Sequence, residues 1–279
     1  MRCAWPQLLA ILPQWMRKQV DILGSKKMQE LRLRVGQLPE LICQGERHRL
    51  ERTIQKEDIC FVINTASQYS PWAASTSAQG YITAPGGHRI GICGEVVVHE
   101  GVMTGIRTVF SACIRVARDF DDLAFSLRGM RGSVLIIGKP GSGKTTLLRD
   151  LIRSRSNGGG GSVGVVDERG EIFPDCGCFP MGSRTDVMRG CNKRDGIEIL
   201  LRTMGPDTIA VDEITSEADC AALVKAAWCG VDLFATAHAS SKADLRNRSV
   251  YRPLLQQGLF EHLVVVHGDK SCTTERMML

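Results

Sequence analysis

The second half of this chain repeats short, mostly apolar runs that alternate with longer amphipathic stretches. The runs are SVLIIG, SVGVVD, DTIAVD, VDLFAT and HLVVVH, at residues 133–138, 162–167, 207–212, 231–236 and 262–267. Between them lie stretches long enough for helices, such as KTTLLRDLIRSR, DGIEILLRTM and EADCAALVKAAW. Strands that are apolar on both faces and alternate with helices are typical of a parallel sheet covered on both sides. This half is therefore predicted to be an α/β domain built on a parallel sheet.

The first half has a different pattern, and we place the boundary between the two near residues 117–133. We expect a smaller mixed α/β domain over residues 1–125 and the larger α/β domain over residues 126–279. In the smaller domain, residues 57–70 have helical spacing. Residues 88–101 are interpreted as paired strands broken by glycines.

Composition indicates an ordinary globular chain, with 43% hydrophobic and 23% charged residues. No apolar stretch approaches the ~18 residues that a membrane span needs. The first 20 residues are interpreted as a short amphipathic helix, not a signal peptide, because Pro6 and Pro13 interrupt them. We therefore expect a cytoplasmic protein whose contact with a membrane is peripheral. Its 11 cysteines lack a CxxC pair, and even Cys176, Cys178 and Cys191 lack zinc-site spacing, which favours thiols in a reducing cytosol.

The net charge of +5 lies entirely in the first half of the chain. Residues 1–131 carry 17 Lys and Arg against 12 Asp and Glu, whereas residues 132–279 carry 18 of each sign. Such an excess is compatible with a contact to nucleic acid, to an acidic membrane surface or to a neighbouring subunit's nucleotide. There is no Lys/Arg-rich run and no interleaving of basic and aromatic residues, so nucleic acid is not favoured.

A phosphate-binding motif stands between the first apolar run and the helix that follows it. GKPGSGKTT, at residues 138–146, fits the pattern G-x-x-x-x-G-K-[ST]. Glycines let backbone N–H groups converge on phosphate oxygens, and the helix N-terminus adds its positive end. Lys144 is predicted to reach the β- and γ-phosphates, and the Thr145 hydroxyl to join the shell of a Mg²⁺ ion. The predicted ATP-binding residues of this segment are Gly138, Lys139, Pro140, Gly141, Ser142, Gly143, Lys144, Thr145 and Thr146.

Two apolar runs end in an Asp-Glu pair, and one of them invites a GTPase interpretation. DERG at residues 167–170 fits D-x-x-G, and NKRD at residues 192–195 fits the guanine-reading N-K-x-D. However, SRTDVMRGC before Asn192 is too polar for a buried strand, and 25 positions from Asp167 leave too little room for a strand and a helix. We therefore predict that Asn192 or Asp195 caps the next helix.

The alternative is a RecA-like arrangement in which the second acidic pair serves the nucleotide. Asp212 would then complete the Mg²⁺ shell, and Glu213 would orient and activate the attacking water. Adjacent acids at a strand end are expected to point to opposite sides of the pleat, which suits two duties. The strand at residues 231–236 is expected between the P-loop strand and the Asp212 strand. Thr236 or His238 would then lie near the γ-phosphate, and His238 is assigned to nucleotide binding.

Several of these motifs, in this order, resemble the stage III sporulation protein AA family. They are GKPGSGKTTLLRDLIR, VVDERGEI, SRTDVMRGC, DTIAVDEIT and ATAHAS, and the likeness extends more loosely to GGHRIGICGEVVV and CIRVARD. More broadly they are similar to the ATPases of type II and type IV secretion and of type IV pili. The resemblance implies a RecA-like ATPase domain after an N-terminal domain, assembled as a ring expected to contain six subunits. It further implies a place beside membrane-embedded components of a channel between mother cell and forespore.

The resemblance also implies roles for further residues. In the secretion ATPases the region of DERGE is an acidic box, which gives Asp167 a supporting place beside the nucleotide and Glu168 one in catalysis. Ring ATPases usually receive an arginine from a neighbouring subunit. The candidates are Arg115, Arg118, Arg184 and Arg189, of which Arg184 is preferred because it lies within a matching motif. The shorter N-terminal half and the single histidine after the fourth strand depart from the larger secretion ATPases.

The sequence thus predicts a Mg²⁺-dependent ATPase in which water attacks the γ-phosphate and the energy drives mechanical work on a partner. One alternative is a RecA-like nucleic-acid motor or loader, supported by the basic first half alone. Another is a scaffold that binds ATP and scarcely hydrolyses it. Glu213 speaks against the scaffold, because a protein that only binds ATP has no need of it.

Overall fold

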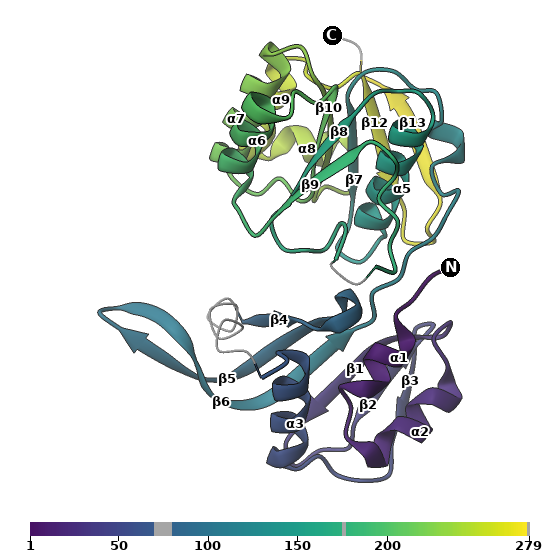
Figure 1. Ribbon diagram of the computed structural model, residues 1–279, viewed down its shortest axis with the longest axis vertical. Coiled ribbons are helices and arrows are strands. Elements are labelled where there is room, and N and C mark those ends of the chain that lie inside the picture. Colours follow the sequence, from purple (N-terminus) through teal and green to yellow (C-terminus); the bar gives the residue numbers. More distant parts are fainter. Residues whose placement is uncertain (70–79, 175–176, 278–279) are drawn as a thin grey trace. The chain divides into compact units, whose positions relative to one another are not determined.

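The computed structural model describes residues 1–69, 80–174 and 177–277, which fall into two compact units (Figure 1). The first unit comprises Met1–Asp119 with Pro174–Cys178, and the second Phe120–Phe173 with Phe179–Leu279. Cys176 and the last residue of the helical stretch expected at 57–70 lie outside the described residues.

The first unit is built on an antiparallel sheet. Its described part has six strands in the order β3-β2-β1-β6-β5-β4, and every neighbouring pair is antiparallel. The strands are β1 (Met28–Arg34), β2 (Glu40–Cys43), β3 (Glu46–Arg49), β4 (Tyr81–Thr83), β5 (Arg89–His99) and β6 (Val102–Arg115), with a 3₁₀ turn η1 at Pro85–Gly87.

Helices α1 (Trp5–Ala10), α2 (Gln14–Leu23) and α3 (Lys56–Ala66) accompany this sheet. The predicted single N-terminal helix is therefore two helices in succession. Pro6 lies in the first turn of α1 and Pro13 is the N-cap of α2, two places where a missing N–H costs little. Helix α3 confirms the expected helical spacing and begins with a capping box between Gln55 and Asp58. Apolar side chains of helices and strands, Leu8 and Leu31 among them, form one buried core.

Residues 88–101 do not form the broken pair of strands that the sequence suggested. Strand β5 runs continuously, and its partner is the following strand β6. The register shifts between Cys93 and Gly94, and a Cβ at Gly94 would lie only 1.8 Å from the carbonyl oxygen of Thr108. The glycine therefore permits a β-bulge with close backbone contact and does not end the strand.

The outer part of the β5–β6 pair, residues 95–107, extends past the other strands of its sheet, and we call it the arm (Figure 1). Its valines are exposed to an unusual degree: Val96 by 51%, Val98 by 57% and Val102 by 65%. A two-stranded ribbon alone is marginally stable in water, so apolar residues on such a ribbon indicate a contact surface.

The second unit contains the predicted α/β domain. In its described residues the sheet has seven strands in the order β13-β12-β7-β11-β10-β8-β9, parallel except for the pair β12–β13. The strands are β7 (Val134–Gly138), β8 (Val163–Asp167), β9 (Thr185–Arg189), β10 (Thr208–Val211), β11 (Asp232–Ala237), β12 (His262–Val266) and β13 (Cys272–Arg276). The five apolar runs are all strands, and β11 lies between β7 and β10, as predicted.

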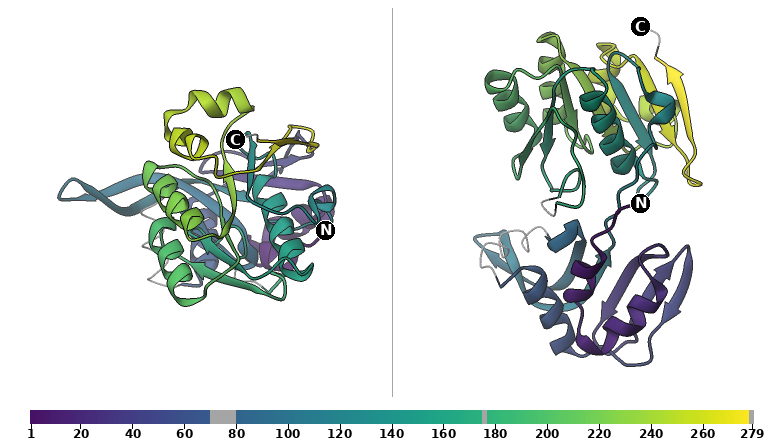
Figure 2. Two further views of the ribbon diagram at one scale, coloured as in Figure 1. Left: turned by 90° about the horizontal axis from the view of Figure 1, so that it is seen from above. Right: turned by 45° about the vertical axis from the view of Figure 1, so that its right-hand side comes forward.

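Helices cover both faces of this sheet (Figures 1 and 2). Alternate strand residues, such as Leu135 and Ile137, share one apolar core with α6, α7 and α9, while α5 packs on the other face. The helices are α5 (Lys144–Asn157), α6 (Lys193–Thr203), α7 (Glu217–Trp228), α8 (Lys242–Asn247) and α9 (Arg252–Gln256), with 3₁₀ turns η2 (Phe125–Leu127) and η3 (Ser249–Tyr251). Parallel strands with helices on both faces confirm the predicted fold class.

Two strands, β9 and β13, were not predicted from the sequence. Both lie at the edges of the sheet, where only one neighbour is needed and an apolar sequence is not required. All five residues of β13 are exposed, and β9 is at most half-buried. The polar segment before Asn192 is therefore a strand after all, contrary to the argument used against the GTPase interpretation.

Candidate functional site

The carboxyl ends of the parallel strands meet at one edge of the sheet, and four of them carry predicted site residues. Ligands of open α/β sheets bind at this edge. The P-loop follows β7, Asp167 ends β8, Asp212 follows β10, and His238 follows β11. The order of the strands therefore brings together motifs that are up to 100 residues apart in the sequence.

The predicted P-loop is a tight turn between β7 and α5. Gly141 and Gly143 have φ angles of +73° and +107°, which side chains with a Cβ rarely adopt, and Gly143 is the N-cap of α5. Lys139, Pro140 and Gly141 are exposed at the turn. Backbone N–H groups at a helix N-terminus after such a turn suit a phosphate.

Two observations at the base of the loop support a fit to phosphate. Ser142 is 4% exposed, and its Oγ has no hydrogen-bond partner among the described residues. A Cβ at Gly138 would lie 2.6 Å from that Oγ and 2.7 Å from the carbonyl oxygen of Val266. The loop thus closes tightly at its base around a buried hydroxyl that has no hydrogen-bond partner among the described residues, as a loop that changes on binding a ligand would.

Lys144 is buried and donates three hydrogen bonds. Its Nζ lies 3.0 Å from each of the carbonyl oxygens of Gly138 and Lys139, and 3.0 Å from Nδ1 of His238. Burial lowers the pKa of Lys144, and the nearby carboxylates of Asp212 and Glu213 oppose this shift. Because an ammonium group can only donate, Nδ1 of His238 is the acceptor and its Nε2 carries the proton.

Asp212 binds the hydroxyl groups of two threonines. Its Oδ2 accepts a hydrogen bond of 2.7 Å from Thr145, and its Oδ1 accepts one from Thr236. The carboxylate of Asp212 and the hydroxyl of Thr145 together offer two oxygen ligands. Mg²⁺ in proteins is usually bound by a few such oxygens, with waters and phosphate oxygens of the substrate as its other ligands. The two residues predicted to hold Mg²⁺ are therefore adjacent, and their chemistry fits the ion.

Glu213 has a strained backbone and a fully engaged carboxylate. Its φ is +54°, unusual for a residue other than glycine, so the expected alternation of Asp212 and Glu213 across a pleat is wrong. The strand ends at Val211, and the Glu213 N–H donates to Oγ1 of Thr236 at 2.8 Å. Its Oε1 accepts from Nε2 of His238 at 2.8 Å. Its Oε2 accepts from Nη1 of Arg169 at 2.6 Å.

Asp167 has a different environment at the end of β8. Its Oδ1 accepts hydrogen bonds from the N–H groups of Glu171 and Ile172, at 2.8 and 3.1 Å, and its Oδ2 from Phe173 at 2.8 Å. The side chain is 2% exposed. Burial raises the pKa of Asp167, and the backbone donors oppose this in part. Its carboxylate thus organises the loop at residues 168–173.

Glu168, the next acid, is directed toward helix α6. It accepts a hydrogen bond of 2.6 Å from Nζ of Lys193, whose side chain is buried and also lies 3.7 Å from Asp219. The geometry therefore gives Glu168 a partner outside the P-loop, whereas Glu213 is joined to the P-loop lysine through His238. Residues of both acidic pairs nevertheless line one small cavity. Its lining residues are Glu168, Arg169, Glu171, Lys193, Asp212 and Glu213.

The candidate arginines lie in different places. Arg184 precedes β9, and its backbone N–H and guanidinium contact Ser156, at the amino edge of the sheet. Arg189 ends β9 beside Asp167 at the carboxyl edge. In the first unit, Arg115 is exposed at the end of β6, whereas Arg118 donates to the carbonyl oxygens of Ser25 and Met28. The role of Arg184 in a neighbouring subunit stays a prediction.

The segment NKRD begins a helix, as the capping interpretation predicted. Oδ1 of Asn192 accepts a hydrogen bond of 2.9 Å from the N–H of Asp195, and helix α6 starts at Lys193. Asn192 thus has the geometry of an N-cap.

Sequence reasoning missed three cations at this site. Arg169 lies within the DERG motif, Lys193 within NKRD, and Lys270 in the turn before β13, from which its Nζ donates to the carbonyl oxygen of Gly141 at 2.5 Å. Arg169 and Lys193 could have been noticed from the sequence, because each is a basic residue within a motif that also contains acidic residues. Lys270 carries no motif, and only the pairing of β12 with β7 places it near the P-loop.

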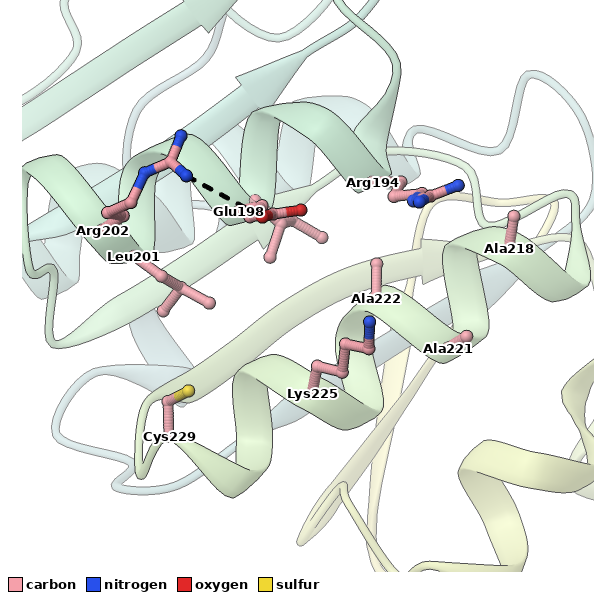
Figure 3. A pocket seen from close by; sticks show the side chains of 10 residues that line it. Arg194, Glu198, Leu201, Arg202, Ala218, Ala221, Ala222, Lys225 and Cys229 are labelled. Atoms are coloured by element: carbon pink, nitrogen blue, oxygen red, sulfur yellow. Dashed lines mark ion pairs between the residues drawn. The ribbon is translucent and has the colours of Figure 1, made fainter.

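A second concave surface, between α6 and α7, has a different character (Figure 3). Its lining is mainly apolar and includes four charged side chains; the lining residues are Arg194, Ile197, Glu198, Leu201, Arg202, Ala218, Ala221, Ala222, Lys225 and Cys229. Converging polar groups of the kind that orient a nucleotide are found at the carboxyl edge instead.

Within residues 1–69, 80–174 and 177–277, no group of three or more His, Cys, Asp or Glu side chains is placed to hold a metal ion. Across the same residues, no helix has the length and apolar character needed to cross a membrane.

Solved structures define the class of fold. The ATPase DotB of Legionella pneumophila matches 95% of this chain and 80% of its own, with a TM-score of 0.62 and 18% identity. The pilus retraction motor PilT with bound ADP matches 91% of this chain and 78% of its own, with a TM-score of 0.61 and 14% identity. The protein thus has the fold of the secretion ATPases, a mostly parallel sheet preceded by an antiparallel N-terminal sheet.

Sequence comparison defines the family. The model of the family described as Sporulation stage III, protein AA matches residues 5–277, and the chain belongs to this family. Stage III sporulation protein AA of Bacillus subtilis (strain 168) is 33% identical over 283 residues, which cover 95% of this chain and 91% of the relative. Competence protein ComGA of Streptococcus pneumoniae is 32% identical over 149 residues, covering 53% of this chain and 44% of ComGA. The resemblance seen in the motifs is confirmed.

Proposed function

We propose that this protein binds ATP with Mg²⁺ at the carboxyl edge of the parallel sheet and hydrolyses it. The observation that carries the proposal is a connected set of side chains. The hydroxyl of Thr145 joins Asp212, and the ammonium of Lys144 joins His238, which in turn joins Glu213. A phosphate loop, an oxygen pair for Mg²⁺ and a carboxylate able to accept a proton are the parts that this chemistry requires.

Each side chain has a distinct task in the proposed reaction. Lys144 transfers its N–H donors from its backbone acceptors to phosphate oxygens. Thr145 and Asp212 would hold Mg²⁺, which when bound neutralises charge on the phosphates. Glu213 orients the attacking water and accepts its proton. His238 lies between Lys144 and Glu213, and so links phosphate binding to the position of the carboxylate.

Hydrolysis is tested by phosphate release from ATP in the wild type and in Lys144→Ala. We expect turnover in the wild type, and loss of both turnover and binding of a fluorescent ATP analogue in the variant. Lys242→Ala, a lysine on α8, is the matched control and should retain both. Turnover that survives Lys144→Ala would refute the proposal. Binding without turnover in the wild type would favour the scaffold, and stimulation by single-stranded DNA would favour the nucleic-acid motor.

We further propose that the protein assembles into a ring, of six subunits by resemblance to its relatives, and that a neighbour supplies an arginine in trans. Turnover per subunit should then rise with protein concentration. Turnover that is independent of concentration, measured across the range in which light scattering detects assembly, would count against the ring.

Two apolar surfaces support self-assembly, and we propose that the arm of one copy occupies the α6–α7 groove of another. The groove lining carries Arg194, Arg202 and Lys225 against Glu198, a net charge of +2. The arm, with two acids, Arg107 and neutral histidine, has a net charge of −1. Opposite charge around apolar centres favours association in a defined register.

Cross-linking tests this contact, because Cys229 is exposed at the groove. In Val102→Cys, mild oxidation should produce a dimer on a non-reducing gel. The dimer should disappear in Val102→Cys/Cys229→Ser. An absent dimer, or one that survives removal of Cys229, would refute this contact and leave the ATPase proposal standing.

The cellular setting that we propose follows from the family. Membership supports a cytoplasmic ATPase, peripheral at a membrane, that energises membrane-embedded components of a channel between mother cell and forespore. Co-purification of such components from sporulating cells, dependent on the protein, is the expected result. Recovery in a fraction free of membrane throughout sporulation would contradict it.

A further inference from the structure

Both carboxylate oxygens of Glu213 are engaged by side chains from other elements. His238, after β11, donates to Oε1, and Arg169, from the loop after β8, donates to Oε2 at 2.6 Å. The side chains of Arg169 and Glu213 are 39% and 29% exposed, so the ion pair is partly shielded from water. Each oxygen of the Glu213 carboxylate thus already accepts a hydrogen bond from a side chain.

The loop that carries Arg169 is held by hydrogen bonds of the residues before and after Arg169. Before it, Asp167 accepts three backbone N–H groups of the loop, and Glu168 is paired with the buried Lys193. The backbone that carries the Arg169 guanidinium is therefore already ordered. This reduces the conformational entropy that is lost when Arg169 pairs with Glu213.

The backbone of Glu213 is fixed as well. Its left-handed conformation is held by the hydrogen bond to Oγ1 of Thr236, and the next residue, Ile214, donates to the carbonyl oxygen of the same threonine at 2.9 Å. Strain of this kind persists where surrounding contacts determine it, and it is concentrated at functional sites. Two fixed elements therefore present Arg169 and Glu213 to each other.

We propose that Arg169 is a positioning residue that restrains Glu213, so that the carboxylate takes the water's proton only when the Arg169 contact opens. This inference rests on the proposed ATPase function and adds a regulating residue to it. The contacts form a row, Lys144–His238–Glu213–Arg169, which runs from the P-loop to the DERGE loop. A phosphate that draws Lys144 away from His238 acts on one end of this row, and rotation of the Arg169 side chain away from Glu213 acts on the other.

The inference predicts a separation of kcat from KM. Partly exposed ion pairs contribute about 0.2–1 kcal/mol, so Arg169→Ala should raise kcat for ATP about 1.4- to 5-fold. The KM for ATP should change by less than about two-fold, because Lys144 and the P-loop are untouched. Arg169→Lys keeps the charge without the planar guanidinium and should lie between the wild type and Arg169→Ala.

The experiment measures steady-state phosphate release and binding of a fluorescent ATP analogue for the wild type, Arg169→Ala, Arg169→Gln and Arg169→Lys. Arg246→Ala, an arginine on α8, is the matched control and should behave as the wild type. Thermal melting establishes that each variant is folded, and Arg169→Gln replaces Arg169→Ala if the latter is not. A kcat that falls or stays constant, or a KM that moves together with kcat, would overturn the restraint.

Failure of the restraint is distinguishable from failure of the ATPase proposal. If Lys144→Ala abolishes turnover while Arg169→Ala does not raise it, the ATPase proposal stands and the restraint is wrong. If turnover persists in Lys144→Ala, the ATPase proposal itself is wrong, and so is the restraint that rests on it.

Discussion

An Asp-Glu pair stands at the carboxyl end of β8 and another directly after β10, yet the two pairs have different surroundings. Asp167 is buried under three backbone N–H groups of its own loop, whereas Asp212 accepts hydrogen bonds from the hydroxyls of Thr145 and Thr236. Glu168 is paired with Lys193 on α6, whereas Glu213 is bound by His238 and Arg169.

The difference shows that the duty of an acidic pair is set by the donors around it. Backbone amides that converge on one carboxylate stabilise a loop, since each amide finds its acceptor locally. A carboxylate whose partner is a P-loop hydroxyl, as Asp212 is with Thr145, can instead bind a cation such as Mg²⁺ together with that hydroxyl. We therefore assign a structural duty to the first pair and the chemical duty to the second.

Within this comparison, a large loss of activity is expected from removing the charge of Asp212. Asp212→Asn should lower Mg²⁺-dependent turnover by about 100-fold or more, on the scale of removing one preorganised electrostatic group. Asp167→Asn should lower turnover much less in protein that remains folded. Phosphate release with saturating ATP and Mg²⁺ makes the comparison. Equal losses in the two variants would mean that both acids serve the metal.

The free energy of unfolding should be lowered more by Asp167→Asn than by Asp212→Asn, the reverse of the order expected for turnover. Asp167→Asn replaces one accepting oxygen by a donor that faces the Phe173 N–H, and leaving a buried group unsatisfied costs about 1–3 kcal/mol. Asp212→Asn, at a half-buried position, should cost less. Urea unfolding of both variants at neutral pH measures the difference. A less stable Asp212→Asn would reverse our assignment of the structural role.

The acidity of Asp167 offers a smaller test of the same role. Its pKa is raised from 3.8, so the native state holds its proton more tightly than the unfolded chain does. Its contribution to stability should therefore decrease as the pH rises from just below 3.8 through the raised pKa, and should then stay constant. Melting temperatures of the wild type and Asp167→Asn, compared across this range, measure it. A wild-type advantage that grows with pH would contradict the direction of the shift.

The smallest effect concerns Asn192, which the GTPase interpretation would place on guanine. Asn192→Ala should cost about 1 kcal/mol through the lost N-cap, without changing the preference for ATP over GTP. Thermal melting and competition between the two nucleotides check both parts. A changed preference would restore NKRD as a base-reading motif.

The sequence predicts the parallel sheet well, because its central strands are buried on both faces and must be apolar along their whole length. Edge strands β9 and β13 escape that requirement, and their polar sequences resemble loops. The P-loop is predictable for a similar reason, since residues with a Cβ rarely adopt the φ angles found at positions 141 and 143.

The partners of the acids were harder to predict. The pairing of Glu168 with Lys193 joins residues 25 positions apart, and that of Arg169 with Glu213 residues 44 apart. The left-handed conformation of Glu213 also depends on Thr236 of another strand. Such contacts arise from the order of strands in the sheet and leave no local periodicity in the sequence.

The most direct test of the account compares Glu213→Gln with Glu168→Gln. We predict that Glu213→Gln binds ATP as the wild type does and loses turnover by about 100- to 10,000-fold, the range that general base catalysis contributes. Glu168→Gln should keep turnover within about ten-fold of the wild type, because its partner is Lys193. Normal hydrolysis by Glu213→Gln together with inactive Glu168→Gln would contradict the assignment of catalysis to the β10 strand.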